Sequence, residues 1–145
     1  MTVSTYVGPV VVTLAYILLY YGFVVHVGVM KARRARVYKE KGEPYDRYFT
    51  PDREMLAADR MQLNTLEQMP PFLVLLWLNA VFVGPMGATI AGGVYVLARA
   101  AYPLALGKRM GRGVRAMVLA STVPGYLVIL YFMGALSWAL IDVLT

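Results

Sequence analysis

Long uncharged stretches alternate with short basic ones along this chain of 145 residues. The first uncharged stretch covers residues 6–30, and the longest covers residues 68–98. About 20 helical residues are enough to cross a hydrocarbon core of about 30 Å. The longest stretch contains Gly84-Pro85 near its middle, a pair that is typical of a tight turn. The Gly84-Pro85 pair therefore predicts that this stretch belongs to two helices, one ending and one beginning there, rather than to one long helix.

The positions of Lys and Arg support this division. All 14 of these residues lie between Lys31 and Arg115. Basic residues in short loops mark the cytoplasmic side of a membrane protein, and only four spans place both basic connectors on the same side. We therefore predict an all-α integral membrane protein built as a four-transmembrane-helix bundle of one domain, with both termini outside. The expected spans are about 6–30, 56–83, 86–106 and 114–141, and the cytoplasmic connectors are 31–55 and 107–113.

The first connector ends in Thr50-Pro51-Asp52-Arg53-Glu54. This order is typical of a helix start, with Thr50 as the N-cap, proline at the first helical position and acidic residues in the first turn. The pattern predicts that the second helix begins close to Pro51.

Composition supports the membrane assignment and excludes several classes of protein. The chain is 59% hydrophobic and 15% charged, whereas a soluble domain has about 25% charged residues. Its net charge of +6 is concentrated at the connectors, so we expect a membrane protein that contacts lipid and no nucleic acid. The absence of cysteine and the single histidine, His26, argue against a metal site. We interpret His26 as a structural residue of the first helix.

Two clusters of polar residues interrupt the predicted spans. Arg60, Asn64 and Glu67 fall on one helical stripe at the start of the second span. Arg99 lies in the third span, with Tyr95 and Tyr102 on the same face. Ionisable groups at membrane depth tend to face the bundle interior and carry function. The alternatives are an intrahelical Arg60–Glu67 pair and an arginine that snorkels to the headgroups.

Basic residues also flank the connectors and converge on the same side of the membrane. They determine topology and attract anionic lipid. Together with the polar stripe they suit a small polyanionic ligand, because guanidinium groups bind carboxylates in a bidentate manner and Glu67 offers a carboxylate to an ammonium group. The basic residues concerned are Arg33, Arg34, Arg36, Lys108, Arg109, Arg112 and Arg115.

These residues resemble a known family, the membrane-associated proteins in eicosanoid and glutathione metabolism (MAPEG), which includes the microsomal glutathione S-transferases. The most specific match is Arg60-Met-Gln-Leu-Asn64-Thr-Leu-Glu67 followed by Pro70-Pro71-Phe72. The run Ala32-Arg33-Arg34-Ala35 is similar to the basic cluster of the family. Ala98-Arg99, with Tyr102 three residues later, is similar to its third-span pattern.

The resemblance implies a homotrimer with active sites between neighbouring subunits and with glutathione as the co-substrate. It implies that glutathione is held by Arg33, Arg34, Arg60, Asn64, Glu67, Arg99 and Tyr102. It further implies that an arginine at the start of the fourth span stabilises the thiolate, with Arg115 as the first candidate and Arg112 as the second. The activated sulfur would attack a lipophilic electrophile or a lipid hydroperoxide.

Three functional hypotheses remain open at this point. The first is a glutathione transferase, with peroxidase activity as a second reaction. The second is a non-catalytic lipid-binding or scaffold protein of the same fold, which Gln68 and Leu106 favour because some branches of the family carry tyrosine there. The third is a small transporter or channel. The short termini are bacterial in style, which indicates a bacterial inner membrane with the glutathione site on its cytoplasmic side.

Overall fold

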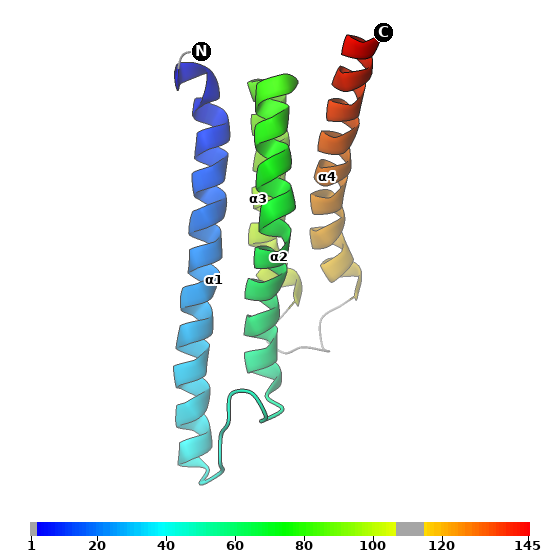
Figure 1. The fold of residues 1–145 in the computed structure, drawn as a ribbon. Coiled ribbons are helices and arrows are strands. Elements are labelled where there is room, and N and C mark those ends of the chain that lie inside the picture. The colour runs from blue at the N-terminus through cyan, green and yellow to red at the C-terminus, as the bar shows by residue number, and fades with distance from the viewer. Residues whose placement is uncertain (1–2, 107–114) are drawn as a thin grey trace.

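The computed structural model describes residues 3–106 and 115–145, with the backbone alone at residues 3, 105–106 and 115–121. These residues form a short 3-10 helix, η1, and four long helices. Both termini and the α2–α3 turn lie at one end of the bundle, and the α1–α2 connector lies at the other (Figure 1). The elements are η1 (Val3–Tyr6), α1 (Val7–Glu40), α2 (Arg53–Phe82), α3 (Pro85–Leu106) and α4 (Arg115–Leu144).

The predicted four-helix architecture is confirmed, but α1 is longer than its uncharged stretch. It continues ten residues past Met30, so the first connector is helical as far as Glu40. The residues from Lys31 to Glu40 are mostly Lys, Arg, Ala and Glu, which are strong helix formers. The helix ends where Gly42 adopts a φ of 69°, a left-handed conformation that glycine tolerates best.

The predicted N-cap of α2 is wrong by two residues. Asp52 is the N-cap, and its Oδ1 accepts hydrogen bonds from the backbone N–H groups of Glu54 and Met55, both at 2.9 Å. A carboxylate at this position also interacts favourably with the positive end of the helix dipole, which a threonine hydroxyl cannot do. Thr50 instead accepts a hydrogen bond from the backbone N–H of Asp46 at 2.8 Å.

The turn predicted at Gly84-Pro85 is confirmed. Helix α2 ends at Phe82, and Pro85 takes the first position of α3, where its missing N–H is not needed. The backbone N–H groups of Val83 and Gly84 both donate to the carbonyl oxygen of Asn79. This tight connection makes α2 and α3 antiparallel neighbours.

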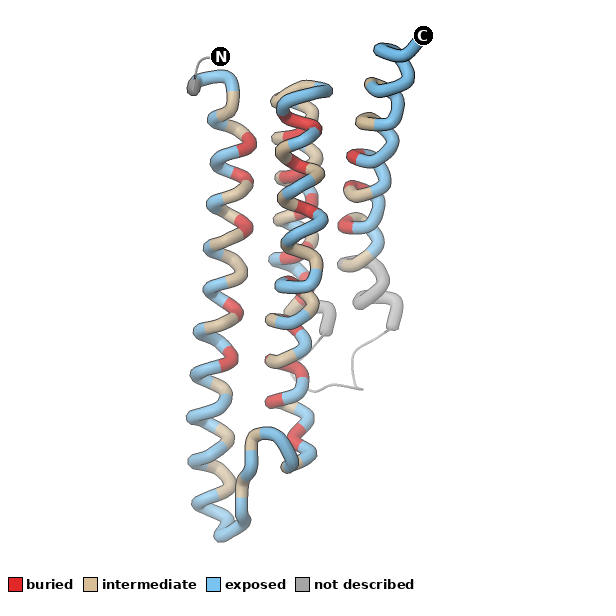
Figure 2. Tube along the Cα trace, in the orientation of Figure 1, coloured by how far each residue is buried: buried red, intermediate tan, exposed pale blue. Residues whose placement is uncertain are grey.

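An aromatic cluster joins the first three helices in the middle of the bundle. The ring of Phe72 in α2 stacks on Tyr95 in α3, with centroids 4.0 Å apart and an interplanar angle of 9°. Tyr16 of α1 packs against both rings, and its hydroxyl donates to the carbonyl oxygen of Thr65 at 2.7 Å. All three aromatic side chains are fully buried. Buried positions follow the inward faces of the helices (Figure 2).

The outward faces of α1 and α4 are apolar. Leu18, Val25, Leu130 and Trp138 are each more than 60% exposed in the single chain. Among the described residues, the segments Ser4–Glu40 and Thr122–Leu144 are long and apolar enough to cross a membrane. Large contiguous apolar surfaces of this kind need lipid or another subunit to cover them.

Ion pairs fasten the extension of α1 to the start of α2. Arg34 Nε lies 2.6 Å from Asp52 Oδ2, and Arg34 Nη1 lies 3.2 Å from Glu54. Burial opposes ionisation of Asp52, but the backbone N–H of Met55 and the Arg34 guanidinium outweigh it and lower the pKa of the carboxyl. The Asp52 carboxylate therefore caps α2 and anchors α1 at the same time.

We expect Asp52→Asn to destabilise the protein by roughly 1.5–3 kcal/mol at neutral pH, because a hydrogen-bonded charge is lost. Since the pKa of Asp52 is lowered by folding, its charge contributes fully above the unfolded-state pKa of about 3.9. That contribution disappears as the pH falls through the lower pKa of the folded protein. Thermal unfolding in detergent at several pH values should therefore show the gap between wild type and variant closing in acid.

The matched control is Asp142→Asn, which changes an exposed aspartate of α4 and should leave the unfolding temperature unchanged. If the difference in unfolding temperature between wild type and Asp52→Asn stays constant as the pH is lowered, the proposed role of the Asp52 charge is contradicted.

Candidate functional site

A polar pocket lies between α2, α3 and α4, on the connector side of the aromatic cluster. Its volume is about 200 Å³. Asn64 and Tyr102 meet across it, and Asn64 Nδ2 donates to the Tyr102 hydroxyl at 2.8 Å. The pocket is lined by Asn64, Glu67, Gln68, Arg99, Tyr102, Thr122 and Tyr126. Four of the residues singled out in the sequence are thus brought together: Asn64, Glu67, Arg99 and Tyr102.

Arg99 is the most unusual of these residues. It is only 5% exposed, and its Cζ lies 5.4 Å from the ring centroid of Tyr95. None of the ion pairs within the described part of the chain involves it. Arg99 is thus buried between the helices of the bundle. A buried cation without an ion pair is costly and favours an anion in the pocket.

Arg60 does not join this pocket. It lies one turn before Asn64 and is exposed, so the three-residue stripe predicted on α2 is divided between the pocket and the outer surface. The alternative of an intrahelical pair between Arg60 and Glu67 is also absent from the ion pairs of the described residues. Glu67 therefore keeps its carboxylate available on the pocket side.

The two arginines that follow the first span have different surroundings. Arg34 is occupied by Asp52 and Glu54, whereas Arg33 is exposed and lines a second cavity. Of the two candidates for thiolate stabilisation, Arg115 is the first residue of α4, and Arg112 lies outside the described residues.

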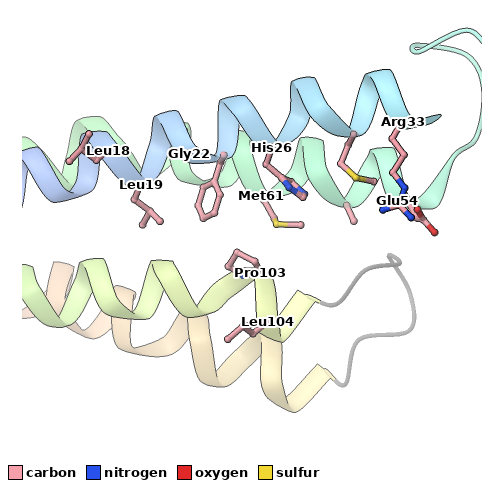
Figure 3. A pocket seen from close by; sticks show the side chains of 12 residues that line it. Leu18, Leu19, Gly22, His26, Arg33, Glu54, Met61, Pro103 and Leu104 are labelled. Carbon is pink, nitrogen blue, oxygen red and sulfur yellow. The ribbon is translucent and has the colours of Figure 1, made fainter. Parts of the chain in front are cut away.

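The second cavity is large and mostly apolar. It has a volume of about 790 Å³ and lies between α1, α2 and the end of α3. Arg33 and Glu54 lie at its connector end (Figure 3). His26, which the sequence indicated as structural, is an exposed residue of the cavity wall. Most of the remaining lining is aliphatic, including Leu18, Leu19, Met30, Met61 and Leu104.

Three residues of the polar pocket were missed by the sequence analysis as site residues. Gln68 follows Glu67 directly and was noted only as a departure from the family pattern. Thr122 and Tyr126 are one helical turn apart on α4, a spacing that places them on one face. That spacing was the available signal, but α4 is apolar almost throughout, and its pattern alone does not indicate which face meets α2 and α3.

Two prolines lie inside α2 next to the pocket. Pro70 and Pro71 have no N–H to donate, so the carbonyl oxygens of Leu66 and Glu67 lose their usual helical partners. In a membrane protein such carbonyls are tolerated where other groups can satisfy them. The prolines therefore add backbone acceptors close to the Glu67 side chain.

We expect Arg99→Met to leave the thermal stability of the ligand-free protein unchanged or higher, because an apolar side chain of similar length replaces a buried charge that has no ion pair. The control is Arg34→Met, which removes a paired arginine and should lower the unfolding temperature. Unfolding curves of both variants in the same detergent test this contrast. Equal losses in the two variants would show that Arg99 is as well neutralised as Arg34.

Comparison with known proteins places this arrangement in a family. The chain is 34% identical over 102 residues to an uncharacterized protein, sll1147, of Synechocystis sp. (strain ATCC 27184 / PCC 6803 / Kazusa). That match covers 70% of this chain and 69% of the relative. The model of the MAPEG family matches residues 9–138, which include all of α2 and α3 and most of α1 and α4. The chain therefore belongs to the MAPEG family of membrane proteins.

Proposed function

We propose that this protein is a membrane-bound glutathione transferase that joins the glutathione thiolate to lipophilic electrophiles. The observation that carries the proposal is the buried Arg99 in a pocket shared with Glu67, Asn64 and Tyr102. Membership of the MAPEG family, which includes glutathione transferases, supports the same reaction class. Reduction of a lipid hydroperoxide by the same thiolate is the second reaction that we propose.

The chemistry of the pocket fits glutathione, which carries two carboxylates, one ammonium group and one thiol. The Arg99 guanidinium can bind a carboxylate through two parallel hydrogen bonds. Glu67 can pair with the ammonium group, and the amide of Asn64 can bond to the peptide groups. One carboxylate and the ammonium group of the ligand therefore each have a counterpart of opposite sign in the pocket.

The size of the pocket supports a site that a second subunit completes. A volume of about 200 Å³ is below the range of about 300–1,000 Å³ usual for small-molecule pockets. Arg33 and Arg60 lie outside this pocket in the single chain. We propose a homotrimer with sites between subunits, which would enlarge the pocket and give these arginines access to the same ligand.

The proposed reaction depends on forming a thiolate, because the anion is a far stronger nucleophile than the thiol. A guanidinium beside the sulfur in a low-dielectric site favours the anion. We propose Arg115 for this role, with Arg112 as the second candidate. The substrate would be a lipophilic electrophile that enters through the bilayer, and the site would face the cytoplasmic side of a bacterial inner membrane with both termini outside.

Ultraviolet difference spectroscopy of the detergent-purified protein tests thiolate formation, because a thiolate absorbs where a thiol does not. We expect a thiolate band with glutathione at neutral pH and none with S-methylglutathione, which cannot ionise. Arg99→Met should abolish binding of both ligands, as measured by calorimetry. Arg115→Ala should retain binding and lose the band.

Arg112→Ala is the control for Arg115→Ala. If both variants retain the full band and full conjugation activity, neither arginine stabilises the thiolate. If the wild-type protein binds no glutathione, the transferase proposal fails as a whole.

The large apolar cavity favours a second candidate function, that of a non-catalytic lipid-binding or scaffold protein. Its volume of about 790 Å³ and its aliphatic lining suit an acyl chain, with Arg33 and Glu54 at the end where a headgroup would lie. Purified protein that carries lipid but neither binds nor uses glutathione would favour this function. Glutathione turnover with a lipophilic electrophile would favour the enzyme.

A further inference from the structure

Two aromatic side chains project from the connector between α1 and α2. Tyr48 and Phe49 are 83% and 87% exposed, which makes them the most exposed aromatic residues of the described chain. They are adjacent in sequence and lie among charged residues, so they do not belong to a local apolar core. Neither the polar pocket nor the apolar cavity includes them.

The turn that carries them is held together by its own hydrogen bonds. Asp46 Oδ1 accepts from the backbone N–H groups of Tyr48 at 2.7 Å and Phe49 at 3.2 Å. Asp46 and Thr50 also exchange two further bonds, one through the Thr50 hydroxyl at 2.8 Å and one between backbones at 2.9 Å. The turn therefore presents the two rings in a preformed conformation with its polar groups largely satisfied.

Two ion pairs hold this turn and its flanking residues at a defined position along the axis of the bundle. Arg34 binds Asp52 at 2.6 Å, and Arg47 Nη2 binds Asp59 Oδ1 at 3.0 Å. Arg47 belongs to the turn itself, and Asp52 follows the turn by two residues. The two anchoring aspartates, Asp52 and Asp59, are seven residues apart, or about 10 Å along a helix. The aromatic pair is thus held beside the first two turns of α2.

The first two turns of α2 lie beside the end of the uncharged part of α1. Val27 packs against Met55 and Ala58, and Met30 packs against the same cluster. These two α2 residues lie between the anchors Asp52 and Asp59, so the anchors span the boundary at which the uncharged stretch gives way to the basic residues. In a bilayer this boundary is the headgroup region, about 5–8 Å thick on each side of the hydrocarbon core.

The charges around the turn are predominantly positive. Asp52, Glu54 and Asp59 are all engaged by arginines. Seven exposed basic residues have no ion pair within the described chain, against three acidic residues of the connector, Glu40, Glu43 and Asp46. The basic residues are Lys31, Arg33, Arg36, Lys39, Lys41, Arg53 and Arg60. Aromatic side chains are enriched at the headgroup level of membrane proteins, and basic residues beside them attract anionic lipid.

We propose that the turn from Asp46 to Thr50 inserts the side chains of Tyr48 and Phe49 into the headgroup region of an anionic bilayer leaflet. The partner is the lipid surface itself, and the contact anchors the α1–α2 connector to the membrane. This inference stands on the connector alone and does not depend on the reaction that the pocket performs.

Spin labelling tests the proposal on the full chain, because the protein has no cysteine and each variant carries a single label. Labels at Phe49→Cys and at Lys41→Cys, which is exposed just beyond the end of α1, are compared in vesicles of phosphatidylcholine and phosphatidylglycerol. We expect the label at position 49 to be several-fold less accessible to a water-soluble nickel chelate than the label at position 41, and more accessible to oxygen.

Two outcomes would overturn the proposal. Equal nickel accessibility at the two positions would place the rings in water. Protection of the label at position 49 from both nickel and oxygen would show that protein, such as a neighbouring subunit, covers it.

A second pair of variants tests whether the preformed turn matters. In the Phe49→Cys background, Asp46→Ala removes the acceptor of the turn, whereas Asp46→Asn keeps an oxygen at the same position. We expect the alanine variant to increase label mobility and nickel accessibility and the asparagine variant to retain the depth of the label. Unchanged depth in both would show that the Asp46 bonds do not present the rings to the membrane.

Discussion

The stack of Phe72 on Tyr95 sets the register between α2 and α3, and the polar pocket depends on that register. The two helices are antiparallel, so one turn from the stack toward the connector brings Gln68 to the level of Arg99. A second turn brings Asn64 to Tyr102, where the hydrogen bond forms. A slip of one residue would rotate each side chain by about 100° and separate these groups.

Much of the fold was predictable because lipid restricts what a chain can do with its backbone. Only helices satisfy every backbone group within one segment, so uncharged stretches between basic connectors indicate helices directly. The helix boundaries were less predictable, as α1 and Asp52 show. The end of α1 is decided by a competition between good helix formers and Gly42, and the start of α2 by a cap that also binds Arg34.

The pocket was predictable only in part, for a related reason. Polar groups within an apolar helix are costly and tend to carry function, and this made four residues recognisable in the sequence: Asn64, Glu67, Arg99 and Tyr102. Arg33 and Arg34 look equivalent in sequence, and only the tertiary contacts of Arg34 distinguish them. The roles proposed for Arg60, Arg115 and Arg112 stay predictions, since they depend on a ligand or a second subunit.

The ion pairs between α1 and α2 also bear on how the large cavity can change its width. Arg34 and its two carboxylates join these helices into one stiff wall, whereas the facing wall is the last turn of α3. Pro103 lies in that turn and removes the amide that would bond to the carbonyl oxygen of Arg99. The last turn of α3 is therefore the more flexible wall of the cavity, and it is continuous with the backbone of Arg99. A molecule that widens the cavity would shift the same backbone that positions Arg99.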